Sequence, residues 1–97
     1  MLENELRFEW DPRKATRNRA KHGVSFEEAS SVFGDPLGWI VEDPRHSQGE
    51  RRRVLLGSSE RDRLLAVMFT EREGVIRVIS ARKATRRERT SYEEQQD

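Results

Sequence analysis

The sequence predicts an α+β domain in which helices pack on a small, mostly antiparallel sheet. The run 75–82 is apolar or small except for Arg77 and Arg82, which is typical of a strand covered on both faces, so we expect it at the centre of the sheet. A second apolar run, 64–70, is joined to it by the short segment 71–74, which predicts an antiparallel hairpin. Capping signals and helical periodicity elsewhere in the chain predict the helices.

The first helix is predicted over residues 12–22, after a short strand at 8–10. Asp11 is suited to the N-cap, and Pro12 to the first helical position, where its missing N–H costs nothing. Gly23 can end the helix in a left-handed conformation. Its cationic side chains outnumber its apolar ones, so its packing is expected to rest on three residues in or beside it: Ala15, Ala20 and Trp10.

A second helix is predicted from Ser25, which forms a capping-box pattern with Glu28 and precedes an apolar stripe ending before Gly34. A last helix runs from Thr85, capped with Glu88, through about residue 94. The remaining elements are strands at 39–41 and 53–56, a loop at 43–49 and a turn at 60–63. The predicted order is therefore β-α-α-β-β-β-β-α, within one domain (1–97) whose ends at 1–6 and 95–97 fray.

Composition limits the class of protein. The chain has 97 residues, of which 33% are hydrophobic and 38% charged, so its core is thin and a stabilising partner is expected. The absence of cysteine excludes disulfides and fits a reducing compartment. No apolar run approaches the roughly 20 residues of a membrane helix, and the N-terminus lacks a signal-peptide pattern. We expect a soluble, cytoplasmic protein without a membrane partner.

A net charge of +1 conceals a strong segregation of cationic residues. If the basic blocks meet in space, they form a face for a polyanion; if they do not, they are ordinary solvated patches. The sequence leaves both possibilities open. The three blocks are residues 13–21, 51–53 and 82–89.

The two histidines are the first candidates for chemistry. His22 lies in the last turn of the first helix, where it either complements the helix dipole or belongs to a site. His46 lies in a polar loop near Glu50 and Arg52, a combination that could supply an acid, a base and charge stabilisation, although a lone loop histidine is often merely exposed. Histidines so far apart lack the spacing of metal ligands, so no metal site is predicted.

The second candidates are arginines. Arg77 and Arg82 lie on the predicted central strand, where a guanidinium is either a positioned phosphate clamp or a solvated charge. Tyr92 on the last helix either packs on the sheet or faces a ligand. These observations favour an anionic partner such as nucleic acid, and do not decide between binding and cutting it.

Several further motifs occur in order along residues 8 to 93. They are Phe8–Pro12, Asn18, Lys21–Ala29, Val32–Phe33, Asp35–Pro36, Asp43, His46–Ser47, Glu50, Arg52, Gly57, Thr70–Arg72, Ile76–Thr85, Glu88 and Tyr92. Taken together and in register, these segments resemble one family, the BrnT toxins of type II toxin–antitoxin systems. Arg51 and Arg53 depart from the acid and the apolar residue expected there.

This resemblance implies a RelE-like fold and a ribonuclease that cleaves RNA without a metal or other cofactor and arrests translation. It also implies a DNA-binding antitoxin, BrnA, that neutralises the toxin. It further implies that the complex represses its own operon and that the toxin meets operator DNA only through the antitoxin.

The resemblance also suggests site residues. Arg72 and Arg82, joined by Arg52, are expected at the phosphate, with His46 and Glu50 as the acid–base pair. Lys21 or His22 is expected to add a cation or a proton donor. The expected RNA contacts are Lys21, Arg77, Lys83 and Arg86. The alternative is a non-catalytic module that binds nucleic acid or an antitoxin with the same basic face.

Overall fold

A computed structural model describes residues 6–42 and 51–96 of the chain. The order of elements confirms the prediction, with a 3₁₀ helix added directly after the second α-helix. No helix within these two ranges is long and apolar enough to cross a membrane. The elements are β1 (Arg7–Glu9), α1 (Pro12–His22), α2 (Phe26–Ser31), η1 (Val32–Gly34), β2 (Trp39–Glu42), β3 (Arg53–Ser58), β4 (Leu64–Arg72), β5 (Val75–Lys83) and α3 (Arg86–Glu94).

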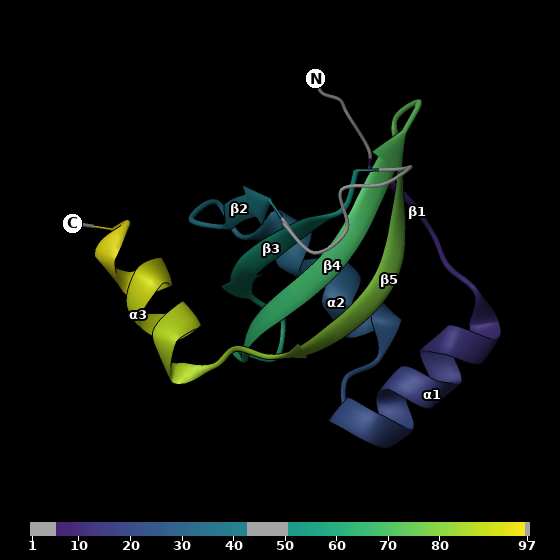
Figure 1. The fold of residues 1–97 in the computed structure, drawn as a ribbon, viewed down its shortest axis with the longest axis horizontal. Coiled ribbons are helices and arrows are strands. Elements are labelled where there is room, and N and C mark those ends of the chain that lie inside the picture. Colours follow the sequence, from purple (N-terminus) through teal and green to yellow (C-terminus); the bar gives the residue numbers. More distant parts are fainter. Residues whose placement is uncertain (1–5, 43–50, 97) are drawn as a thin grey trace.

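The sheet is mixed, with the strand order β1-β5-β4-β3-β2 (Figure 1). β1 pairs with β5 in parallel, and the other three pairings are antiparallel. The prediction that residues 75–82 form the centre was wrong: β4 is the middle strand, because β3 and β2 add to its far side. β1 pairs only with residues 75–77 of β5, so within the described chain the rest of β5 has no strand on that side.

The two faces of the sheet differ in what covers them. The main core lies on the face covered by α1 and α2, where Leu65, Val67 and Phe69 of β4 meet Phe26 of α2. We call this the α2 face. The opposite face carries a smaller cluster with α3, and we call it the α3 face. That cluster comprises Val54, Leu56, Ala66, Met68 and Tyr92.

A β-bulge resets the alternation of β5. Met68 pairs with Ser80 but the next residue, Phe69, pairs with Val78, so Ile79 is an extra residue in β5. Because of this insertion, Arg77 and Arg82 lie on the same face of the sheet. Without the bulge, an odd separation of five residues would place them on opposite faces.

The hairpin between β4 and β5 is tighter than expected. The strands extend to Arg72 and Val75, which pair with each other, so only Glu73 and Gly74 form the turn. Both turn residues have positive φ, +52° for Glu73 and +81° for Gly74. Positive φ at both central positions defines the type I′ turn, whose twist matches that of the flanking strands.

α1 begins and ends as predicted. Asp11 accepts a hydrogen bond from the Arg13 N–H (2.8 Å), and Gly23 ends the helix at φ +71°. The expected role of Ala20 in packing was wrong, because Ala20 is exposed. The polar Asn18 is the buried residue of this helix instead.

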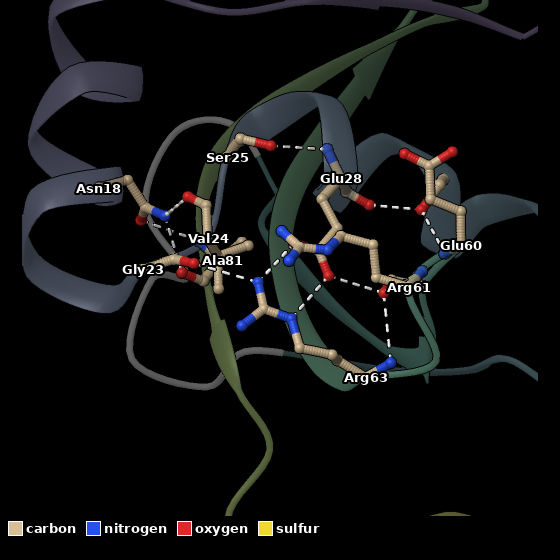
Figure 2. Close-up of polar contacts among 11 residues, drawn as sticks. Asn18, Gly23, Val24, Ser25, Glu28, Glu60, Arg61, Arg63 and Ala81 are labelled. Carbon is tan, nitrogen blue, oxygen red and sulfur yellow. Dashed lines mark hydrogen bonds and ion pairs between the residues drawn. The ribbon is translucent and has the colours of Figure 1, made fainter.

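Asn18 fastens α1 to the half of β5 that β1 does not pair with (Figure 2). Its side-chain NH₂ donates to the carbonyl oxygens of Val24 and Ala81, both at 2.9 Å, and its side-chain oxygen accepts from the Ala81 N–H at 3.0 Å. One amide thus satisfies both backbone groups of Ala81, as a neighbouring strand would.

The predicted capping box of α2 forms only in part. Ser25 accepts a hydrogen bond from the Glu28 N–H (3.0 Å), but the Glu28 carboxylate binds Arg63 and Ser59 instead (Figure 2). Glu28 is 3% exposed, and Arg63 also donates to the Gly23 carbonyl (3.1 Å). The hydrogen bond from Arg63 keeps the pKa of Glu28 below its usual range although burial opposes it. This network joins α2 to the turn between β3 and β4.

α3 is attached at both ends. The Thr85–Glu88 capping box is confirmed in both directions. Near the other end, the Tyr92 hydroxyl donates to Asp35 (2.6 Å), and its ring packs on the sheet, which decides between the two readings left open for this residue. Gln95 and Gln96 continue α3 as a hydrogen-bonded turn. Of the ends that were expected to fray, residues 1–5 and 97 lie outside the described residues, as does the expected loop 43–49.

Candidate nucleic-acid interface

The α3 face is hollowed beside the β4–β5 turn by a pocket of about 430 Å³. β1 contributes Arg7 and Glu9 to this hairpin pocket, and β4 contributes Thr70 and Arg72. Arg77 of β5 lies between them, paired in register with Glu9 on one side and Thr70 on the other. The complete lining of the hairpin pocket is Arg7, Glu9, Thr70, Arg72, Glu73, Val75 and Arg77.

Three guanidinium groups and two carboxylates line this pocket, so cationic side chains outnumber anionic ones. Arg77 Nη1 lies 3.1 Å from Glu9 Oε2, and both side chains are about half exposed, so solvent screens the pair and a competing anion can reach it. Thr70 is 2% exposed and adds a hydroxyl to the lining. Arginine forks suit phosphate oxygens, so the pocket is chemically suited to a phosphodiester.

The structure separates two arginines that were expected to share one phosphate. Arg72 pairs with Val75 beside the hairpin turn, whereas Arg82 pairs with Ala66 toward the other end of β4. The six residue steps along β4 from Ala66 to Arg72 correspond to about 20 Å of strand. Both lie on the α3 face, but the hairpin pocket is lined by Arg72 and not by Arg82.

Arg82 has a partner of its own. Its Nη1 and Nη2 atoms donate to the two carboxylate oxygens of Glu88 at 2.7 and 3.0 Å, a bidentate pair. The hydrogen bond to Glu88 raises the pKa of Arg82 above its usual value, and the same bond lowers the pKa of Glu88. Since Glu88 also completes the cap of α3, Arg82 ties the end of β5 to that helix.

Lys21 and His22 belong to a different pocket, of about 300 Å³, between α1 and the bulged part of β5. We call it the α1 pocket. It shares no lining residue with the hairpin pocket. Its lining comprises Lys14, Arg17, Asn18, Lys21, His22, Ile79 and Ser80.

The other predicted residues are dispersed. Arg52 is half-buried and directly precedes β3, Lys83 is exposed at the end of β5, and Arg86 is exposed at the start of α3. His46 and Glu50 lie outside the described residues.

The three basic blocks do not form one continuous face in the described chain. α1 and α3, which carry the first and third, lie on opposite sides of the molecule (Figure 1). In the second, Arg51 pairs with Glu42 (3.1 Å). Arg53 pairs with Glu71 (3.1 Å) and lies 5.2 Å from the centre of the Phe69 ring, so its departure from the expected apolar residue is accommodated by an aromatic neighbour.

Sequence reasoning missed Arg7 and Glu9. The available signal was their position either side of Phe8, because alternation in a short strand places both on the face opposite the core residue. The parallel pairing that sets them beside Arg77 could not be read from the sequence, since nothing local specifies which strand β1 joins.

The fold and its cationic pockets define a small α+β protein with arginine- and lysine-lined surfaces along one inner strand. Comparison with known proteins gives the family. A family model described as the ribonuclease toxin BrnT of type II toxin–antitoxin systems matches residues 10–88, and the chain belongs to this family. Type II systems pair each toxin with an antitoxin, so the family implies an antitoxin partner.

A solved structure supports the fold. The chain is similar to the ribonuclease toxin BrnT of Brucella abortus, whose crystal structure was determined at 1.1 Å resolution. The two share 24% identity, and the match covers 84% of this chain and all of the other, with a TM-score of 0.61. No curated protein sequence matches the chain.

Proposed function

We propose that this chain is a metal-independent endoribonuclease whose scissile phosphate binds in the hairpin pocket. The observation that carries the proposal is the convergence of Arg7, Arg72 and Arg77 on one hollow of the α3 face. Membership of a ribonuclease toxin family supplies the reaction class. Three guanidinium groups can stabilise a charged phosphorane-like transition state without a metal ion.

The proposed reaction is an internal transesterification. The ribose 2′-oxygen attacks the adjacent phosphorus as a base removes its proton, and the bond from phosphorus to the 5′-oxygen breaks as that oxygen takes up a proton. The products are a 2′,3′-cyclic phosphate and a 5′-hydroxyl. Arg72 and Arg77 neutralise the non-bridging oxygens, and Glu9 orients Arg77.

His46 and Glu50 remain the proposed acid–base pair, on the strength of the family motif alone. Arg82 is not assigned to the scissile phosphate, because Glu88 binds its guanidinium at the other end of the strand. Its proposed role is to hold α3 in place. Arg52, Lys83 and Arg86 are proposed as outer contacts to the RNA backbone.

The biological setting is part of the proposal. We infer that RNA cleavage by this chain arrests translation in the cytoplasm and that a BrnA-type DNA-binding antitoxin neutralises it. The complex would repress its own operon, with operator DNA bound by the antitoxin alone. The fold is proposed to be a variant of the RelE type. Family membership supports each of these inferences.

The proposal is tested by incubating the purified chain with a defined RNA in the presence of a chelator and mapping the ends of the products. Cleavage that leaves cyclic phosphates and 5′-hydroxyls is expected. RNA that stays intact but bound, with affinity falling as salt rises, would establish the non-catalytic binding module instead. RNA neither bound nor cut would leave the antitoxin-binding module.

A further inference from the structure

The α1 pocket gathers cations from one side of a single helix. Lys14, Arg17 and Lys21 are spaced three and four residues apart, so they form one stripe, and His22 follows at its end. α1 contains no acidic residue, and none lines the pocket. The stripe therefore has no carboxylate of its own helix to neutralise it.

The helix that carries this stripe is held in a fixed position. Asn18, which also lines the pocket, is 6% exposed and makes its three hydrogen bonds to the backbone of Val24 and Ala81. These bonds fix the backbone of α1 against β5, so the stripe faces the strand at a set distance. Cations on a rigid support lose less entropy when they bind an anion.

β5 connects the two pockets. It contributes Val75 and Arg77 to the hairpin pocket and Ile79 and Ser80 to the α1 pocket. The step from Arg77 to Ser80 corresponds to about 10 Å of strand. A single-stranded nucleic acid a few nucleotides long spans such a distance, and proteins that bind single strands follow the backbone with positively charged surfaces.

We propose that the α1 pocket binds the backbone phosphates of the single-stranded RNA next to the scissile phosphate. This inference rests on the proposed function and adds the substrate class: an RNA strand that runs along β5 and is longer than a dinucleotide. Lys14 and Arg17 each bind one flanking phosphate. Ile79 offers an apolar surface to a base or ribose, and Ser80 adds a hydroxyl. The position of both pockets along β5 favours RNA over an acidic protein segment as the occupant.

The test compares two double variants that remove the same charge from the same helix. Lys14→Ala with Arg17→Ala strips the pocket side of α1. Arg13→Ala with Arg19→Ala removes two cations that do not line the pocket. Each is assayed for cleavage of a dinucleotide and of a longer RNA. Binding is measured separately with a 2′-O-methyl RNA, which lacks the nucleophile and cannot be cut.

The pocket variant is expected to raise KM for the longer RNA roughly tenfold with kcat unchanged, and to cleave the dinucleotide like the wild type. Its binding of the 2′-O-methyl RNA should lose about 1.4 from the slope of log K against log salt, about 0.7 for each phosphate contact. The control variant should resemble the wild type in KM, kcat and slope.

Equal behaviour of the two variants would overturn the inference and leave the proposed function standing. If the wild type cleaves neither substrate, the proposed function is overturned. The slope of log K against log salt for the 2′-O-methyl RNA then still decides the role of the α1 pocket. If the pocket variant binds RNA normally but no longer binds its antitoxin, the pocket is a protein interface and the inference is wrong.

Discussion

Asn18 does for the edge of β5 what a neighbouring strand would do. β1 ends beside Arg77, so the backbone of Ala81 would otherwise be unpaired and buried. A side-chain amide offers one acceptor and two donors, the combination that Ala81 and Val24 require. Neither aspartate nor leucine could supply it.

Replacing Asn18 with Asp should therefore lower the free energy of unfolding by roughly 3 kcal/mol at neutral pH, because a buried carboxylate would face two carbonyl oxygens. Protonating that carboxylate restores one donor, so the deficit relative to the wild type should shrink at acid pH. Urea denaturation at both pH values measures it. Thr16→Asp, exposed on the same helix, is the control, and equal losses in the two variants would refute the role of Asn18.

Tyr92 gives a spectroscopic prediction, since it is the only tyrosine of the chain. Burial and the hydrogen bond to Asp35 raise the pKa of Tyr92 to about 12. The unfolded state loses this proton first, so the contribution of Tyr92 to stability falls as pH rises above about 10. Phenolate absorbance should report a higher pKa in the wild type than in Asp35→Asn. Identical titrations, with both proteins still folded, would show that the bond does not form.

At the scale of elements, the β4–β5 turn carries a removable strain. Glu73 adopts a left-handed conformation that asparagine and glycine accept more readily. Glu73→Asn should raise the free energy of unfolding by about 0.5–1 kcal/mol relative to Glu73→Ala, which removes the same carboxylate but keeps the strain. Chemical denaturation of the two variants decides this. An Asn variant no more stable than the Ala variant would argue against a type I′ turn.

The ion pair between Glu28 of α2 and Arg63 of the β3–β4 turn predicts that the free energy of unfolding depends on pH. The folded pKa of Glu28 is lowered by Arg63, so its stabilisation is present above pH 4.5, the ordinary value, and is lost as pH falls through the folded pKa. Glu28→Gln should cost about 2–3 kcal/mol at neutral pH and much less in acid.

Unfolding experiments across the acid range test this, with Glu27→Gln as an exposed neighbour that changes the charge equally. Glu88 and Asp35 also have lowered pKa values, so the relevant quantity is the difference between each variant and the wild type. A Glu28→Gln deficit that stays constant with pH would contradict the account.

Local sequence patterns predicted where the elements lie along the chain better than which elements pack or pair with one another. The caps at Asp11, Ser25 and Thr85 begin the helices as the sequence indicated, because a cap depends only on nearby backbone groups. The position of β5 in the sheet and the bulge at Ile79 depend on strand pairing, which no local signal specifies. The same limit explains why Ala20, and not Asn18, was expected to pack.

At the scale of the whole molecule, the sequence indicated which residues carry charge but not which of them meet. Arg72 and Arg77 were both expected at a site, and the structure places them in one pocket. Arg82 was expected beside Arg72, but the length of the hairpin separates them. The three basic blocks are runs in the sequence, whereas the arginines of the hairpin pocket are isolated residues on three different strands.

The central claim is that the hairpin pocket holds the phosphate that is cut. Its most direct test is the single-turnover rate of RNA cleavage by the wild type, by Arg77→Ala, and by Arg89→Ala, which removes an exposed cation of α3. Arg77→Ala should be slower by roughly 10²–10³, as expected when a transition-state donor is lost, and Arg89→Ala should match the wild type. Wild-type rates in a folded Arg77→Ala protein would contradict the account.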